Sequence, residues 1–330
     1  MTTRTESKGE DLISPADPRI TPRHAQIATL LRAPLRADAS GLDIALVGIP
    51  WDAGSPNRSG GRHAPAQMRE MSRLFRKFNF ATRRSPFESC RVADIGDAPV
   101  NPFDIPGTLK AVDDFLSEVV RQGACPVVTG GDNLISLPVL RAVGKKRPVG
   151  VIHFDAHPDT MDVLLGERYH NGSPFRRAVE EGVVDPTRTV SIGLRGTQFS
   201  ANDYEFNQRM GMTVITIDEY FEAGPAETIR RIRSIVGDGP VHLSFDLDAL
   251  DPAYAPGIGG PEPGGLSTRD CQVLIRGMSG LNAVGADINE LSPPLDPSGI
   301  SAVAALNIMF EMLCVVADSI AARTARSQNA

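Results

Sequence analysis

Short apolar segments that turn polar at their carboxyl ends recur along the chain, and this pattern constrains the fold most. Near-continuous apolar runs are typical of strands buried on both faces of a parallel sheet. Strands are predicted in residues 43–50, 125–131, 149–157, 189–195, 213–218, 241–251 and 282–293. Between them, residues 108–123 and 227–239 carry apolar residues at helical spacing and end near glycine. The alternation predicts an α/β fold around a mainly parallel sheet.

The alternating region has no linker that would divide it, so residues 21–322 are interpreted as a single domain. Residues 1–20 are polar with prolines spaced through them, and we expect a flexible segment there. Residues 323–330 are expected to fray.

The composition argues against several classes of function. The formal net charge is −6 and basic runs are lacking, which disfavours a nucleic-acid partner. The N-terminus lacks the apolar core of a signal peptide, and no stretch reaches about 18 apolar residues. We therefore expect a cytoplasmic protein without a membrane partner. The four cysteines are widely scattered, which disfavours a cysteine zinc site or a redox motif.

Four predicted strands end in polar sequences that suggest chemistry. These tails read GGDN (130–133), DAHPD (155–159), DLDALD (246–251) and NELSP (289–293). In an open parallel sheet the carboxyl ends of the strands line one crevice, where ligands bind. The functional site is therefore predicted at this edge of the sheet.

Two of the tails concentrate carboxylates. Asp155, His157 and Asp159 stand at i, i+2 and i+4, so an extended chain points all three to one side. Asp246 and Asp248 repeat this spacing. Four carboxylates in a small volume cannot all stay ionised unless cations offset them. A single D-x-D at a strand end is often only a loop cap, but two such clusters in one sheet favour a site for two divalent cations. Oxygen-rich ligation with one imidazole suits Mn²⁺ better than Zn²⁺, and two metals would activate water and stabilise developing charge.

The same motifs resemble a known family. GGDN, HFDAHPDT (153–160), SFDLDALDPAYAPG (244–257), EPGGLS (262–267) and INELSP (288–293) are similar to the ureohydrolases, which include arginase, agmatinase and guanidinobutyrase. GSPNRSGGRHAPAQMR (54–69) and the segment 94–105 agree, and the agmatinase/guanidinobutyrase branch is the nearest. The resemblance implies an arginase-like three-layer α/β/α fold, a binuclear manganese centre (nickel in some members) and hydrolysis of a guanidino group, in most members to urea and an amine.

The resemblance also implies residue roles. Asp155 and Asp246 match carboxylates that bridge both metals. His157 and Asp248 match the ligands that complete one metal site, and Asp159 matches a ligand of the other. Glu290 matches the carboxylate that binds the guanidinium group of the substrate, a planar cation suited to a carboxylate partner.

Three positions depart from the family pattern. Asn133 stands where the family has a histidine ligand of the first metal, and an amide carbonyl is a weaker donor than imidazole. Asn171 stands where a proton-shuttling histidine is usual; His170, one residue earlier, can replace it if a bulge swings the ring inward. Gly260 replaces a usual threonine. His153 and His242, inside predicted strands, are interpreted as packed histidines rather than ligands.

These departures leave alternatives open. The first is an active hydrolase of a guanidino acid or amine, or of a biguanide such as metformin, with His170 handling the proton. The second is a non-catalytic or scaffold subunit that supports an intact ureohydrolase paralogue in a hetero-oligomer. A third is a guanidine-binding sensor without turnover. Family members are commonly trimers or hexamers, so a homo-oligomer is the other expected assembly.

Overall fold

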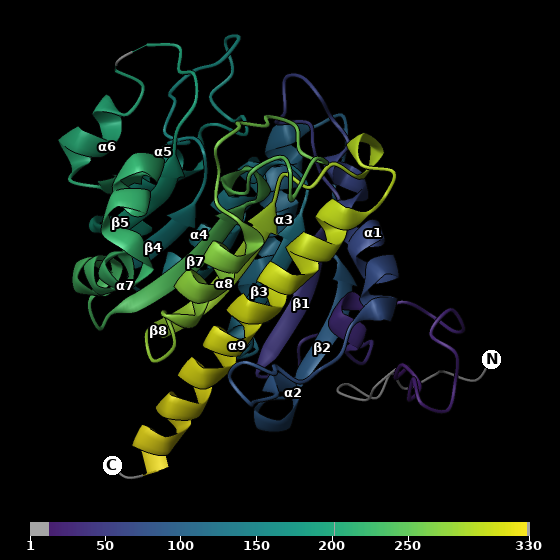
Figure 1. Cartoon of the computed structure of the whole chain (residues 1–330). Helices are drawn as coiled ribbons and strands as arrows, with labels where there is room; N and C mark the ends of the chain where they lie inside the picture. Colours follow the sequence, from purple (N-terminus) through teal and green to yellow (C-terminus); the bar gives the residue numbers. More distant parts are fainter. Residues whose placement is uncertain (1–12, 201, 329–330) are drawn as a thin grey trace.

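Eight parallel strands form one sheet in the computed structural model, which describes residues 13–200 and 202–328 (Figure 1). The strands are β1 (Ile44–Ile49), β2 (Val92–Asp97), β3 (Cys125–Gly130), β4 (Val149–Phe154), β5 (Val184–Leu194), β6 (Thr213–Thr216), β7 (Pro240–Asp246) and β8 (Asn282–Asn289). Their order across the sheet is β2-β1-β3-β8-β7-β4-β5-β6. The predicted parallel sheet is confirmed, with every paired strand parallel to its neighbour.

Helices cover both faces of the sheet and complete three layers. They are α1 (Ala64–Met71), α2 (Pro86–Ser89), α3 (Ile105–Arg121), α4 (Ser136–Gly144), α5 (Pro174–Glu180), α6 (Glu205–Met210), α7 (Ile217–Val236), α8 (Thr268–Arg276) and α9 (Ile300–Gln328). The core clusters place α3, α4 and α5 on one face, and α1, α7, α8 and α9 on the other. The predicted three-layer α/β/α architecture is therefore confirmed.

Strand β2 was not predicted from the sequence. Its segment, VADIGD, is short and carries Asp94 in the middle, so it lacks a continuous apolar run. The structure buries Asp94 completely because the carboxylate accepts hydrogen bonds from the backbone N–H of Leu30 and from the guanidinium of Arg69. A buried ion pair thus replaces the apolar side chain that a pattern search requires.

Helix α9 is long and apolar enough to cross a membrane, with a mean hydropathy of 2.1 over its most apolar window. Polar residues interrupt the helix, so it contains no continuous apolar stretch of membrane-spanning length. Of that window, 72% is buried within the structure. The helix packs against β8, α8 and α1 across one face of the sheet (yellow in Figure 1). Such burial is characteristic of a core helix.

The two chain ends bear on the predicted domain limits. Residues 1–12 of the predicted flexible segment lie outside the described residues. Within the remainder, Ile13 forms a β-bridge with Leu35, and the Ala16 carbonyl accepts a hydrogen bond from Arg32. At the other end α9 continues through residue 328, and 329–330 lie outside the description. Flexibility at either end, and the domain limits themselves, stay predictions.

The strand order places the four polar tails side by side. Strands β3, β8, β7 and β4 are consecutive in the sheet and parallel, so their carboxyl ends meet at one edge. The tail of β3 leaves through Gly131, which lies against the backbone of Trp51. A Cβ atom at Gly131 would lie 1.2 Å from the Trp51 carbonyl oxygen. Only glycine permits this approach.

We expect Gly131→Ala to lower the free energy of unfolding by about 3 kcal/mol or more, because the new methyl group forces two backbone segments apart. Urea unfolding of the metal-free protein measures this. Gly260→Ala is the matched control, since its Cβ would meet only His157 Cε1, at 3.7 Å. That variant should stay within about 0.5 kcal/mol of the wild type. Equal stability of the two variants would contradict the expectation.

Candidate metal centre and active site

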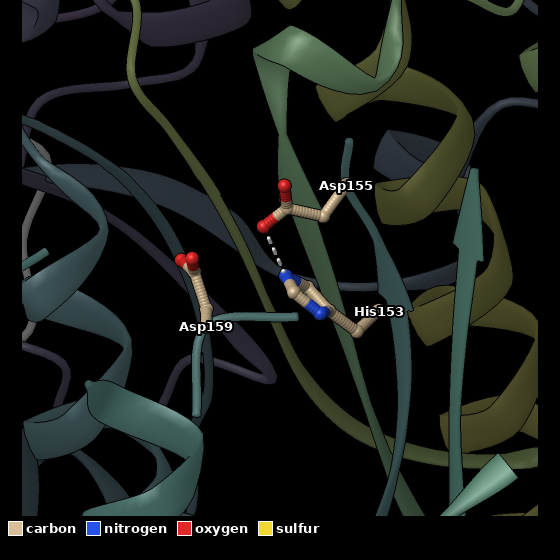
Figure 2. Close-up of side chains that lie close together, drawn as sticks. All are labelled: His153, Asp155 and Asp159. Carbon is tan, nitrogen blue, oxygen red and sulfur yellow. Dashed lines mark ion pairs between the residues drawn. The ribbon is translucent and has the colours of Figure 1, made fainter. Parts of the chain in front are cut away.

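The predicted carboxylates gather where β4 and β7 end. Asp155 follows β4 directly, and Asp159 lies close by at the same edge (Figure 2). Asp246 ends β7, and Asp248 lies in the following 3-10 turn, Leu247–Ala249. Asp155, Asp246 and Asp248 are at most 4% exposed. The sequence therefore brings several carboxylates into one buried volume, as the spacing predicted.

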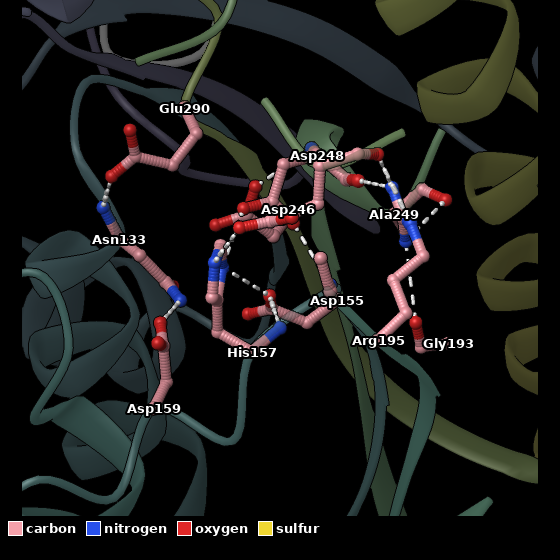
Figure 3. A network of polar contacts seen from close by, with 12 residues as sticks. Asn133, Asp155, His157, Asp159, Gly193, Arg195, Asp246, Asp248, Ala249 and Glu290 are labelled. Carbon is pink, nitrogen blue, oxygen red and sulfur yellow. Dashed lines mark hydrogen bonds and ion pairs between the residues drawn. The ribbon is translucent and has the colours of Figure 1, made fainter. Parts of the chain in front are cut away.

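Local hydrogen bonds fix these carboxylates. The Asp155 Oδ1 atom accepts from the backbone N–H of His157 at 2.6 Å, and Asp246 Oδ1 accepts from that of Asp248 at 2.9 Å. The backbone N–H of Ala156 donates to Asp248 Oδ1 at 2.9 Å, which ties the β4 tail to the β7 tail. The His157 Nδ1 atom lies 2.8 Å from Asp248 Oδ2 (Figure 3). Each i, i+2 pair thus closes a tight turn that orients its own carboxylate.

The electrostatics of this cluster call for cations. Burial raises the pKa of Asp155, Asp159 and Asp246 well above the usual range, and neighbouring carboxylates raise it further. Burial also works to raise the pKa of Asp248, but the ion pair with His157 outweighs it and holds that pKa at about 2. Burial likewise works to lower the pKa of His157, yet Asp248 and Asp155 raise it to about 12. If all four carboxylates are ionised, their charge exceeds what the His157 imidazole can offset.

The donor set fits divalent metal ions. Asp155 Oδ2 is buried and has no hydrogen-bond partner among the residues that the structure describes. Ligand atoms of Asp155, His157 and Asp248 lie within 4.8 Å of one another, and those of Asp155 and Asp159 lie equally close. Asp155 therefore belongs to two groups, as a bridging ligand would. Carboxylate oxygens with an imidazole are the ligands that Mn²⁺ and similar first-row ions prefer.

Asn133 lies beside this cluster, with its side chain fixed by three hydrogen bonds. It opens the short 3-10 turn after β3, Asn133–Ile135. Its Nδ2 donates a hydrogen bond to Asp159 Oδ2 (Figure 3). Its Oδ1 accepts from Ser136 Oγ and from Asn289 Nδ2, both at 2.8 Å. The oxygen is the metal-binding atom of an amide, and here it is engaged by Ser136 and Asn289.

A buried polar network holds Asn133 in this orientation. Asp287 Oδ1 accepts hydrogen bonds from Ser136 Oγ, Ser244 Oγ and Asn289 Nδ2 at 2.9–3.0 Å. Its Oδ2 pairs with the Nε2 of His242, which confirms the interpretation of His242 as a packed histidine. Sequence reasoning missed this network because its members come from β7, β8 and α4, which are remote from one another in sequence. The sequence feature that could have revealed the network is the i, i+2 pair of Asp287 and Asn289, whose side chains share one face of β8.

Glu290 follows β8 and reaches the same edge. Its backbone N–H donates to the Gly131 carbonyl at 2.8 Å, and its φ of +61° turns the chain sharply. Its Oε1 accepts from the backbone N–H of Asn133 at 2.9 Å and from Asn171 Nδ2 at 3.4 Å. Burial raises the pKa of Glu290 to about 7. A buried carboxylate is therefore held ready for a cationic partner.

His170 and Asn171, the two candidates for the proton-shuttle position, have different surroundings. The Asn171 amide reaches Glu290, whereas the His170 ring is 4% exposed and lines the adjacent cavity. Neither ring nitrogen of His170 has a hydrogen-bond partner in the described part of the chain. Burial lowers the pKa of His170, and the charge of Arg177 adds to this effect. The imidazole is therefore neutral near pH 7, and its two unpartnered nitrogens are themselves buried.

Arg195 is a supporting residue that sequence reasoning missed. Its guanidinium donates to the backbone carbonyl of Asp248 at 2.7 Å and more weakly to that of Ala249 (Figure 3). It also donates to the backbone carbonyl of Glu262 at 2.6 Å. These contacts fix the loop that carries Asp248. An arginine after a strand carries no sequence signal for backbone binding, because the carbonyls come from distant segments.

A cavity of about 590 Å³ opens onto the cluster. His157, Asp159, His170, Asn171 and Glu290 lie in its wall. Arg58, Arg176 and Arg209 line the same cavity. The volume is suited to a small molecule that contacts the carboxylate cluster.

The sequence model described as the arginase family matches residues 42–314. The chain belongs to the arginase family. Guanidinopropionase from Pseudomonas aeruginosa is 46% identical over 312 residues, which are 94% of this chain and 98% of that protein. The mitochondrial agmatinase of Gallus gallus is 42% identical over 92% of this chain and 89% of its own length. The structure of proclavaminate amidinohydrolase from Streptomyces clavuligerus superimposes with a TM-score of 0.87 at 36% identity, covering 91% of this chain and 100% of that one.

The family resemblance predicted from the strand tails is therefore confirmed. This arginase-family chain is a ureohydrolase-type amidinohydrolase or a subunit of one. Its family typically binds a pair of divalent metal ions, and the carboxylate cluster described above supplies suitable ligands.

Asp246→Asn tests the charge balance of the cluster. The folded-state pKa of Asp246 lies above the ordinary 3.8, so its ionisation costs stability as the pH rises from about 4 towards 7. At pH 7 the metal-free variant should be more stable than the wild type by on the order of 1 kcal/mol. Mn²⁺ at about 100 times its Kd should stabilise the wild type by about 2.7 kcal/mol.

The variant should lose most of this stabilisation because a neutral amide replaces a carboxylate ligand. Urea unfolding in EDTA and in Mn²⁺ measures both effects. Equal stabilisation of the two proteins by Mn²⁺ would show that Asp246 is not a ligand.

Proposed function

We propose that this chain hydrolyses a C–N bond of a guanidino compound with two divalent metal ions, Mn²⁺ or Ni²⁺. The supporting observation is the buried carboxylate cluster that opens onto a small-molecule cavity with Glu290 in its wall. The ions would be held by Asp155, His157, Asp159, Asp246 and Asp248. When bound, such a metal pair lowers the pKa of water and stabilises negative charge in the transition state.

Glu290 binds and orients the guanidinium group of the substrate. One of its oxygens, Oε1, is already engaged by Asn133 and Asn171. The other, Oε2, has no hydrogen-bond partner among the described residues and stays available to a planar cation. Because the carboxylate is buried, its attraction for a guanidinium is strong. The substrate carbon is thereby held against the metal ligands.

His170 handles the proton that must reach the leaving amine. The ring lines the cavity, is neutral near pH 7 and has two unpartnered nitrogens. A neutral imidazole accepts a proton from the attacking water and delivers it to the departing nitrogen. Asn171 cannot do this, since an amide does not titrate in water.

The cavity wall supports a guanidino acid as the substrate. Arg58 and Arg209 line the cavity, and neither has a carboxylate partner among the described residues, whereas Arg176 is paired with Asp162 and Glu180. A carboxylate at the far end of the substrate would find a bidentate partner there. The relative with 46% identity is a guanidinopropionase, which agrees with this choice over an amine such as agmatine.

Arg209→Ala tests the recognition of the substrate tail. We expect kcat/KM for 3-guanidinopropionate or 4-guanidinobutyrate to fall by about 10- to 100-fold, mainly through KM, because a charged hydrogen bond is lost. Activity on agmatine, whose tail is cationic, should stay equal or rise. An equal loss on both kinds of substrate would contradict a carboxylate subsite at Arg209.

A second candidate function is that of a non-catalytic subunit. Two observations favour it: Asn133 directs its amide nitrogen at Asp159, and Asn171 stands beside Glu290 where family members have a histidine. Such a chain would support an intact ureohydrolase paralogue in a hetero-oligomer. The homo-oligomer, a trimer or hexamer, and the cytoplasmic location also remain proposals.

Assays of the isolated full-length chain separate the two functions. The chain is loaded with Mn²⁺ or Ni²⁺, its metals are counted, and urea release is measured from a panel of guanidino acids, agmatine and metformin. Turnover with two metals per chain supports the hydrolase and contradicts the non-catalytic role. Turnover that requires a co-expressed paralogue contradicts self-sufficient catalysis.

Glu290→Gln serves as the site control in an active preparation. It should lower kcat/KM by about 10- to 100-fold because the guanidinium loses its charged partner. The metal content should stay unchanged, since Glu290 binds substrate and not metal.

A further inference from the structure

His153 stands two residues before Asp155 in β4, so both side chains project from the same face of the strand. The imidazole is 1% exposed and packs against the ring of Phe175, with the ring centroids 4.0 Å apart. Its Nε2 lies 2.8 Å from Asp155 Oδ2 (Figure 2). A histidine interpreted from the sequence as core packing thus faces the carboxylate cluster.

The contact between His153 and Asp155 is close but lacks hydrogen-bond geometry. Both atoms, Nε2 and Oδ2, are buried without a hydrogen-bond partner among the described residues. A carboxylate oxygen of Asp159 lies beside them, and the potential ligand atoms of His153, Asp155 and Asp159 all lie within 4.8 Å of one another. Buried polar atoms in folded proteins almost always have partners. Two buried, unpartnered atoms that converge with an oxygen of the partly buried Asp159 surround a space suited to a cation.

The second ring nitrogen of His153, Nδ1, helps to hold the ring with Nε2 facing Asp155 and Asp159. His153 Nδ1 lies 3.4 Å from the Oγ of Ser191, its register partner on β5. When the hydrogen is on Nδ1, this contact leaves the lone pair of Nε2 directed at Asp155 and Asp159. Histidines that bind metals are oriented in the same way, through their second nitrogen.

Asn133 is unsuited to the same task. Its Oδ1 already accepts hydrogen bonds from Ser136 and Asn289, and its Nδ2 donates to Asp159. Rotating the amide to present the oxygen would break all three contacts in a buried network. An unpaired buried polar group costs about 1–3 kcal/mol.

We propose that His153, and not Asn133, supplies the nitrogen ligand of the metal site that contains Asp155 and Asp159. The cation is a first-row divalent ion such as Mn²⁺ or Ni²⁺, for which imidazole is a suitable donor. Asn133 acts on that site indirectly, by holding Asp159 through its amide nitrogen. This inference rests on the metal-dependent function proposed above.

Metal counting on paired variants tests the proposal. The full-length protein, His153→Asn and Asn133→Ala are loaded with Mn²⁺, desalted and measured by mass spectrometry and by titration calorimetry. His242→Asn is the matched control, because His242 is equally buried one strand away but pairs with Asp287. Circular dichroism checks that each variant is folded.

His153→Asn should bind one metal ion fewer per chain, or bind it at least about 10-fold more weakly. Asn133→Ala and His242→Asn should retain the wild-type number. Unchanged metal content in His153→Asn, or loss of a metal in Asn133→Ala alone, would overturn the proposal.

X-ray absorption at the manganese edge gives a direct readout that does not depend on activity. His157→Asn should retain imidazole scattering around manganese, because His153 still contributes a nitrogen. That scattering should vanish in the His153→Asn, His157→Asn double variant. Absence of imidazole scattering in His157→Asn would overturn the assignment of His153.

The outcomes separate this inference from the proposed function. A wild-type chain that binds no Mn²⁺ or Ni²⁺ would overturn both. A wild-type chain that binds two ions without a contribution from His153 would overturn only the present inference and leave the metal-dependent function in place.

Discussion

The crowding of buried carboxylates at one edge of the parallel sheet is the interaction on which the rest of the structure depends. Asp155, Asp246 and Asp248 are almost fully buried. Two imidazoles lie close to them in the described part of the chain: His157 pairs with Asp248, and His153 faces Asp155. Ionised groups in a site of low dielectric repel strongly, so the arrangement is stable only when cations or protons neutralise it. The carboxylates are crowded because the strand order β3-β8-β7-β4 places the carboxyl ends of these strands side by side.

Much of the surrounding structure serves to hold these groups in position. Backbone N–H groups of the tight turns orient Asp155 and Asp246, while Arg195 binds the carbonyls of the loop that carries Asp248. Behind β3, the network centred on Asp287 fixes the amide of Asn133 through Ser136 and Asn289. Asn133, which the family resemblance places where a histidine is usual, is therefore not an isolated feature. It is accommodated by a network that gives the amide a defined orientation, with its nitrogen towards Asp159.

The sequence predicted the sheet and the gathering of carboxylates at one of its edges, because both follow from local patterns. Continuous apolar runs mark doubly buried strands, and polar residues at i and i+2 after a run mark one side of a strand end. The exceptions are long-range. Strand β2 was not predicted, because Asp94 interrupts its apolar pattern and is buried by an ion pair with Arg69, 25 residues earlier in the chain. The supporting roles of Arg195 and Asp287 and the orientation of Asn133 were not predicted. In each case the hydrogen-bond partners are remote in sequence. His153 is packed against Phe175, as the sequence indicated, but a strand histidine has no sequence signal that tells which atoms its nitrogen faces.

The location of the metal ions is the most direct test of this account. Anomalous diffraction from crystals of the Mn²⁺-loaded protein, recorded at the manganese absorption edge, would locate each ion without reference to activity. We expect two peaks between the ends of β4 and β7, both within coordination distance of carboxylate oxygens of Asp155 and Asp246. Peaks elsewhere in the molecule, or no peak at saturating Mn²⁺, would contradict a metal centre at this edge of the sheet.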